Sequence, residues 1–220
     1  MFIGHYGVSF AAKRWAPELS LGWLFLAVQL LDVLFATFVM LGIEKMRLVP
    51  GITAYNPYDL TFMPYTHGLV GALGWSLLTA LVARLVLGRD GAVAAVALGV
   101  CVFSHWVLDL PMHTRDMPLV GDDTTKIGLG LWRHRDLSLA AEMIALWAGA
   151  AFWLRAPGTS GRARIATGVF LALLTAVLLS TPFMPAPPSV PAFAIFALVS
   201  YVALALLAAW IDRRRRSARA

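Results

Sequence analysis

The sequence predicts an all-α fold: a polytopic membrane bundle of about six transmembrane helices, preceded by a short N-terminal half-helix. Of the 220 residues, 60% are hydrophobic and only 14% are charged, whereas ordinary soluble domains have about 25% charged residues. Mean hydropathy is +0.75. Six apolar stretches are long enough, or nearly so, to cross about 30 Å of hydrocarbon as helices. A soluble domain is excluded, and the single cysteine excludes a disulfide-rich scaffold.

The spans follow one another without room for a second domain, so we expect residues 1–220 to form one membrane domain. Residues 1–17 contain a short segment, 3–15, that is too short to span and is expected to form a half-membrane or interfacial helix turning at Pro17. Residues 19–154 contain the four spans that carry the candidate site, and 165–211 contain two spans expected to be structural. Breaker residues such as Ala156-Pro157-Gly158 separate the spans. The predicted spans are 19–43, 67–88, 92–110, 137–154, 165–182 and 191–211.

The charge pattern predicts membrane orientation rather than binding to nucleic acid. The net charge of +6 comes from 18 Lys and Arg against 12 Asp and Glu, and the basic residues lie at the ends of apolar runs. Such residues mark membrane topology and contact anionic lipids. With six spans and the run Arg213-Arg214-Arg215-Arg216 in the cytoplasm, 12 Lys and Arg fall on the cytoplasmic side and 6 on the other. We therefore expect a multi-pass protein of a bacterial-type inner membrane, with both termini in the cytoplasm.

Polar side chains inside the predicted spans are the main functional signal, because an unpaired ionisable group in hydrocarbon is costly. With a rise of about 1.5 Å per residue, Asp32, His67, His105 and Glu142 fall at one level in the outer half of the membrane, although they belong to four different spans. Asp109 lies one turn beyond His105. The level would also include His5 if residues 3–15 re-enter the membrane.

The strongest local motif is Ser104-His105-Trp106-Val107-Leu108-Asp109. Residues at i and i+4 share one helical face, as two ligands of one metal require, and imidazole and carboxylate both suit Zn²⁺. Pro111 is expected to disrupt the helix and to let His113 turn back toward the same site. The sequence thus predicts a metal site inside the membrane.

Other interpretations of these residues stay open. The His105 and Asp109 pair also fits a plain hydrogen bond. Asp32 is either a ligand, a general base, a proton-relay carboxylate or a partner of Gln29. Glu142 is either a ligand or an acid at a helix start. The cluster around His134 is typical of a solvated loop, and tryptophans near span ends, Trp15, Trp132 and Trp210, are typical of the interface belt.

The order of four short motifs resembles the YdjM-like family of inner-membrane proteins, which are described as metal-dependent hydrolases. The motifs are Gly4-His5, Asp32 in the next apolar segment, Tyr65-Thr66-His67-Gly68 and Ser104-His105-x-x-x-Asp109, and they cover roughly residues 1–120. That family is in turn similar to zinc-dependent phospholipase C, an all-helical enzyme with a trinuclear zinc site.

The resemblance implies a ligand set for this chain. His5, Asp32, His67, His105 and Asp109 match the first five ligand positions, and His113 is a candidate for the sixth. Glu142 matches the last acid, but Ser138 stands where the pattern has a histidine. Gly68 and the surroundings of Asp32 depart from the pattern too. We therefore expect one or two divalent ions, with Zn²⁺ the first choice, rather than three.

The predicted metal site suits metal-assisted hydrolysis inside the membrane, and the resemblance implies a reaction of the phosphoesterase or phospholipase kind. Its substrate would be lipid-linked and would bind near the outer leaflet, with Arg115 or Arg133 neutralising a phosphate. Asp32 is the candidate catalytic base. Two alternatives remain: a transporter for metal ions or protons, and a non-catalytic scaffold with a structural metal.

Overall fold

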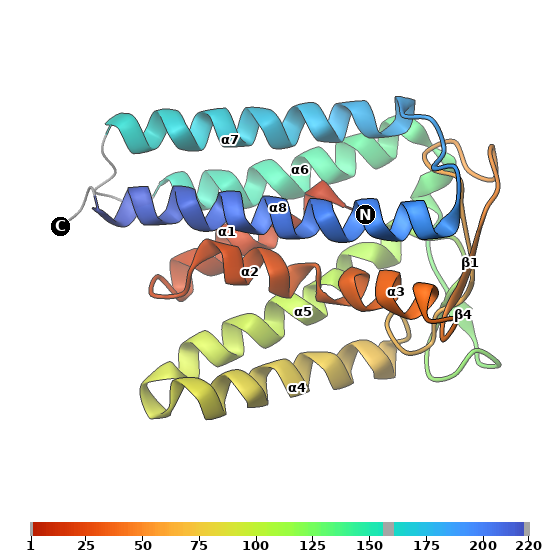
Figure 1. Cartoon of the computed structure of the whole chain (residues 1–220), viewed down its shortest axis with the longest axis horizontal. Helices are drawn as coiled ribbons and strands as arrows, with labels where there is room; N and C mark the ends of the chain where they lie inside the picture. Colours follow the sequence, from red (N-terminus) through yellow and green to blue (C-terminus); the bar gives the residue numbers. More distant parts are fainter. Residues whose placement is uncertain (1, 156–160, 218–220) are drawn as a thin grey trace.

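The helices run roughly along one long axis and form an all-α bundle, as Figure 1 shows for the computed structural model. The structure describes residues 2–155 and 161–217; the predicted break at Ala156-Pro157-Gly158 lies outside the described residues. A short turn of helix at Ile3–His5 leads directly into the first α-helix. The α-helices are α1 (Tyr6–Trp15), α2 (Leu21–Val28), α3 (Leu30–Met40), α4 (Leu69–Leu87), α5 (Ala92–Met112), α6 (Arg135–Leu154), α7 (Gly161–Ser180) and α8 (Val190–Ser217).

The predicted spans are all present, but the first is bent. Five helices are long and apolar enough to cross a membrane, and α2 and α3 qualify only as a pair that bends by 53°. The bend lies at Gln29, whose φ of −101° and ψ of 6° depart from helical values. The prediction of one continuous span over 19–43 is therefore wrong at its middle, and the bend lies three residues before Asp32.

The N-terminal half-helix α1 lies in the interior of the bundle, where it packs on α6, α2 and α5 (Figure 1). Ile3, Tyr6 and Phe10 are fully buried in the apolar core. The backbones of α1 and α6 cross at Gly7 and Gly149, and a Cβ atom at either glycine would collide with a carbonyl oxygen of the other helix. The short helix predicted over residues 3–15 is confirmed, and its place inside the bundle buries His5 completely.

A buried ion pair fixes the other end of α1. The Nζ atom of Lys13 donates to Asp212 Oδ2 on α8 at 2.8 Å and to the backbone oxygens of Pro17 and Leu19. The same carboxylate oxygen accepts from the backbone amide of Leu21 at 3.1 Å. Three segments, the end of α1, the start of α2 and the end of α8, are thus joined at one point.

Two small β-hairpins cap one end of the bundle, which we call the hairpin end. Strand β1 (Lys45–Leu48) pairs antiparallel with β2 (Tyr58–Phe62), and β3 (Met117–Pro118) pairs with β4 (Lys126–Ile127). The hairpins lie at the right of Figure 1, beyond the ends of α3 and α5. At the opposite end, α4 and α5 join through a turn at Gly88, whose φ of 67° favours glycine.

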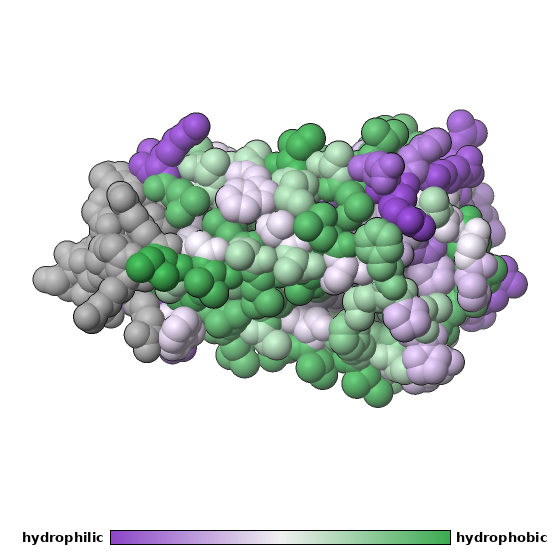
Figure 2. Space-filling view, turned by 90° about the horizontal axis from the view of Figure 1, so that it is seen from above, coloured by the Kyte–Doolittle hydropathy of each residue, from purple (hydrophilic) through white to green (hydrophobic). Residues whose placement is uncertain are grey.

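The outer surface of the bundle is apolar along its middle. Figure 2 shows hydrophobic residues over the central part of the visible face and hydrophilic residues gathered toward the hairpin end and at one edge of the opposite end. Helix α4 is the extreme case: only 6% of its apolar window is buried within the protein, and Leu85 and Val86 are 74% and 78% exposed. So large an apolar surface is typical of contact with lipid, as the composition predicts.

Candidate metal centre

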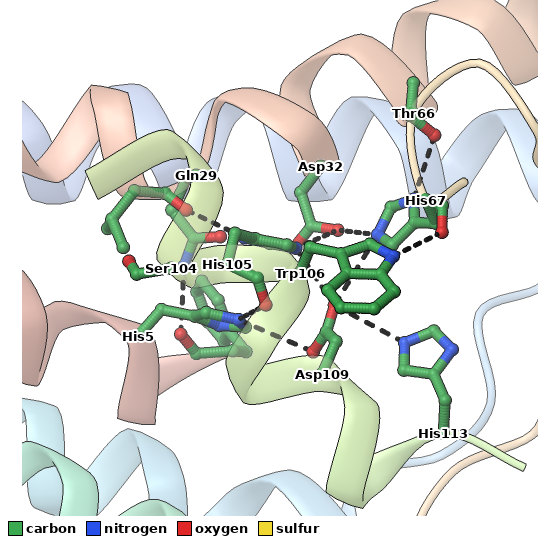
Figure 3. A network of polar contacts seen from close by, with 12 residues as sticks. His5, Gln29, Asp32, Thr66, His67, Ser104, His105, Trp106, Asp109 and His113 are labelled. Carbon is green, nitrogen blue, oxygen red and sulfur yellow. Dashed lines mark hydrogen bonds and ion pairs between the residues drawn. The ribbon is translucent and has the colours of Figure 1, made fainter. Parts of the chain in front are cut away.

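Six polar side chains from five segments converge inside the bundle, near its hairpin end (Figure 3). Each segment brings its residue to this point for a local reason. The N-terminal turn ends at its histidine, α3 starts just before its aspartate, and α5 places two residues one turn apart on one face. The convergent residues are His5, Asp32, His67, His105, Asp109 and His113.

The carboxylate of Asp109 lies at the centre of this cluster. Its Oδ2 atom is 3.0 Å from His105 Nε2, 3.4 Å from His113 Nε2 and 3.6 Å from His67 Nε2. Its Oδ1 atom is 3.5 Å from His5 Nε2. The prediction that Pro111 disrupts the helix is wrong, because α5 continues through Pro111 to Met112. His113 does reach the site, but along the same helical path: its backbone amide donates to the carbonyl oxygen of Asp109 at 2.9 Å, and its side chain lies one turn beyond that of Asp109.

Asp32 faces the same imidazoles from the other side. Its Oδ1 atom lies 3.4 Å from His67 Nε2 and 3.5 Å from His105 Nε2, and its Oδ2 atom accepts a hydrogen bond from Tyr201 at 3.0 Å. The partner of Asp32 is therefore not Gln29, whose amide nitrogen donates to the carbonyl of Phe2. Because Tyr201 belongs to α8, the expectation that the last two spans are purely structural needs correction.

The donor atoms form three overlapping groups that could hold a metal ion. Within each group the ligand atoms all lie within 4.8 Å of one another. His105 Nε2 is fully buried, yet within the described residues it makes no contact with hydrogen-bond geometry. A buried nitrogen without a hydrogen bond is costly, and a cation would satisfy it, so the donor set fits a divalent metal. The groups are His5 with His105 and Asp109, Asp32 with His67 and His105, and His67 with Asp109 and His113.

Three of the histidines have their tautomer fixed by an oxygen acceptor on the far side of the ring. His105 Nδ1 donates to the carbonyl oxygen of Val28 at 2.7 Å, and His113 Nδ1 donates to Asp116 Oδ1 at 3.0 Å. When Nδ1 carries the hydrogen, Nε2 presents a lone pair. In both residues that lone pair faces the centre, which is the arrangement typical of metal-binding histidines.

The third histidine, His67, is held by a relay of two side chains. The hydroxyl of Thr66 donates to Glu44 Oε2 at 2.7 Å, so it must accept from His67 Nδ1, which lies 2.9 Å away. Glu44 Oε1 also accepts from the backbone amides of Tyr65 and Thr66 at 2.9 and 3.0 Å. Burial raises the pKa of Glu44, and the hydrogen bonds from Thr66 and Tyr65 oppose that rise.

Glu142, the seventh predicted ligand, lies outside the three groups. Its Oε2 atom accepts from the backbone amides of Phe2 and Gly4 at 3.2 and 3.0 Å, and its Oε1 atom accepts from Tyr55 at 2.8 Å. These bonds satisfy both carboxylate oxygens, because α6 presents Glu142 to the N-terminal turn rather than to the imidazoles. Glu142 thus holds the N-terminal segment that carries His5. It positions this candidate ligand and is not itself among the candidate metal ligands.

The predicted phosphate-binding arginines lie at the hairpin end. Arg115 is exposed and lines a cavity of about 330 Å³ there, whereas Arg133 is exposed outside the lining of that cavity. His134 is exposed, as predicted for a solvated loop. Trp132 is not a belt residue, since it is 4% exposed and its ring centroid lies 4.1 Å from that of His113.

Sequence reasoning missed three residues that support the ligands: Glu44, Asp116 and Tyr201. Glu44 and Asp116 lie just outside the predicted spans 19–43 and 92–110. The spacing of Asp116, three residues after His113, was a usable signal, because an acid at that distance can reach the ring. Glu44 and Tyr201 meet their partners only through the tertiary fold.

No protein-family model, no curated protein and no solved structure matches this chain.

Proposed function

We propose that this protein is a membrane-embedded metal-dependent hydrolase of the YdjM-like kind, acting on a phosphoester in a lipid-linked substrate. The observation that carries the proposal is the set of imidazoles around Asp109. His67, His105 and His113 each donate through Nδ1 to an oxygen and direct Nε2 toward that carboxylate. A plain hydrogen-bonded pair does not need three rings oriented alike, whereas metal binding does.

The three overlapping groups share residues, so they fit one or two cations rather than three independent ones. His67 and Asp109 would hold one ion together with His113, and His105 would hold another with Asp32 or His5. Zn²⁺ is our first choice because the ligands are imidazoles and carboxylates. When bound, a divalent cation supplies Lewis-acid chemistry, since it polarises a phosphoryl oxygen and acidifies water near neutral pH.

Asp32 is our candidate for the general base. Its side chain is 18% exposed, while those of the five other convergent residues are at most 3% exposed. Water and substrate would therefore reach Asp32 first. Tyr201 holds its Oδ2 atom, which leaves Oδ1 directed at the centre, where it would accept a proton from water.

The position of the centre favours a substrate held in the membrane. The site lies near the hairpin end of an apolar bundle, which is the outer end if the Lys and Arg bias sets the orientation. A lipid head group would approach at this depth without leaving the membrane interface. We therefore place the substrate among phospholipids and polyprenyl phosphates of the outer leaflet.

A second candidate function, transport of a metal ion, is favoured by one observation. The broken span α2–α3 bends by 53° beside the site, and broken helices are common at the ion sites of transporters. The carbonyl that the bend leaves available, Val28 O, is bonded to His105 instead of being open to an ion. This contact favours the hydrolase over the transporter.

The test is a hydrolysis screen on detergent-purified protein, with short-chain phospholipids and an aryl phosphodiester in the presence of Zn²⁺ or Mn²⁺. We expect metal-dependent hydrolysis that falls at least about 100-fold in Asp32→Asn, the range typical of a lost general base. Proteoliposomes loaded with a metal-sensitive dye separate the second candidate. Metal uptake without hydrolysis would contradict the enzyme and support the transporter.

A further inference from the structure

A cavity of about 330 Å³ opens at the hairpin end, between the β1–β2 hairpin and the loops that follow α5. Its wall mixes polar and apolar groups. One side is formed from β2 and the turn before it, and the other from the segment after His113 and from β4. The polar lining residues are Thr53, Tyr58, Asp59, Thr61, Thr114, Arg115, Asp116 and Lys126.

Most charges in this wall are already paired. Asp59 accepts from Arg47 Nε at 2.8 Å, and Lys126 lies 2.6 Å from Asp122. Asp116 accepts from Thr114 at 2.9 Å and from His113. Arg115 has no ion pair within the described part of the chain.

An exposed guanidinium at the mouth of a polar cavity, without an acid of its own, is suited to bind an anion. Arginine presents a planar fork of donors that matches two oxygens of a phosphate. The carboxylate of Asp59 is paired with Arg47, and that of Asp116 is held by His113 and Thr114, so neither forms an ion pair with Arg115. Among the described residues, Arg115 is thus the one cation of the cavity wall that has no ion pair.

Two walls of the cavity adjoin the metal centre. On one side Asp116 holds His113, whose Nε2 atom lies 3.4 Å from Asp109. On the other side burial raises the pKa of Tyr58 to about 12, and the nearby negative charge of Asp32 adds to this rise. Asp116 and His113 thus lie between the cavity and Asp109.

We infer that this cavity is the binding site for a phosphate-bearing group of the substrate, with the guanidinium of Arg115 paired to the phosphate oxygens. This inference rests on the proposed function. The phosphate would belong to a lipid head group or to free phosphate. Because the cavity lies at the end of an apolar bundle, a lipid head group reaches it from the interface.

The test is calorimetric binding to full-length protein in a maltoside detergent and phosphate-free buffer. The probes are dihexanoyl phosphatidic acid, inorganic phosphate and dihexanoylglycerol, which lacks the phosphate. We expect phosphatidic acid to bind and Arg115→Gln to weaken that binding about tenfold or more, as for a lost charge-assisted hydrogen bond. Arg133→Gln is the matched control, because Arg133 is an exposed arginine of the same end outside the cavity lining.

Each outcome decides the inference. Binding lost in Arg115→Gln and kept in Arg133→Gln supports it; equal binding of dihexanoylglycerol, an unaffected Arg115→Gln, or equal losses in both variants would overturn it. Tighter binding of the lipid than of inorganic phosphate identifies a head group, and the reverse identifies free phosphate, both of which support an anion site. Metal content is measured on the same samples, so a metal-free wild type counts against the proposed function and not against the cavity.

Discussion

The Nδ1 atom of His105 lies 2.7 Å from the carbonyl oxygen of Val28, at the point where the first span bends. A continuous α-helix would commit that carbonyl to the amide of Asp32, four residues later. At the bend it accepts from the imidazole instead. One irregularity of the backbone thus orients His105 and starts the helix that carries Asp32, which places both side chains at the same centre.

This contact predicts how the metal is bound. We expect His67, His105 and His113 to bind through Nε2 and to keep their hydrogen on Nδ1, because an oxygen accepts from Nδ1 in each. Nitrogen NMR of protein labelled with ¹⁵N-histidine, with and without Zn²⁺, measures this directly. Metal on the Nδ1 nitrogens would contradict the arrangement of hydrogen bonds described here.

The relay from Glu44 through Thr66 to His67 predicts an effect of a nearly isosteric change. In Glu44→Gln the amide can donate to Thr66, whose hydroxyl can then donate to His67 Nδ1 and leave the hydrogen on Nε2. We expect metal affinity to fall about 10- to 100-fold, as for other lost supporting groups. Titration with Co²⁺, followed by its visible absorption, measures the affinity.

The matched control for this relay is Thr66→Ser, which keeps the hydroxyl and should bind metal like wild type. Equal affinity in Glu44→Gln and wild type would show that Glu44 serves the fold and not the tautomer of His67.

The close helix crossing at Gly7 predicts that a single methyl group added at this position lowers the free energy of unfolding. A Cβ atom in Gly7→Ala would collide with the backbone oxygen of Ala145, so α1 must shift. Overpacking of this kind typically costs about 1–3 kcal/mol, and the shift should also weaken metal binding through His5. Unfolding in mixed micelles measures the free energy.

The control for this prediction is Gly168→Ala on α7, because its Cβ would meet nothing within 4 Å. Similar losses of stability in both variants would show that the close approach of α1 and α6 is not the cause.

The buried pair of Lys13 and Asp212 predicts strong destabilisation when one partner is removed. Both side chains are nearly inaccessible, 6% and 3% exposed, so Asp212→Ala would leave a buried ammonium without its carboxylate. We expect a loss of about 3–5 kcal/mol in the free energy of unfolding. The double variant Lys13→Met with Asp212→Ala should recover part of it. A loss under about 1 kcal/mol, typical of surface pairs, would show that this pair is not effectively buried.

The sequence predicted the spans and the convergence of the polar residues because both follow from hydrophobic length and helical rise. His5, Asp32, His67, His105 and Asp109 are rare polar groups in apolar segments, so their depth could be counted along each helix. His113 was predicted for the wrong reason, because α5 does not break at Pro111 and carries His113 one turn beyond Asp109.

The rest depends on contacts that no local pattern records. The bend at Gln29 occurs in an apolar stretch with no proline or glycine between Trp23 and Leu41, where length and composition predict a continuous helix. Glu142 lies at the predicted depth, but its side chain faces the amides of Phe2 and Gly4. Depth along a helix does not reveal toward which neighbour a side chain points. Tyr201 resembles any other aromatic residue of an apolar span until the fold brings it to Asp32.

The most direct test of the metal centre is element-specific metal analysis of the protein purified in detergent without chelators. We expect at least one equivalent of a divalent transition metal, most of it Zn²⁺, in wild type and in the exposed control His134→Ala. We expect that metal to be lost in the double variant His105→Ala with Asp109→Ala. A folded wild type that holds no metal and takes up none from added Zn²⁺, or a double variant that keeps its metal, would contradict the central claim.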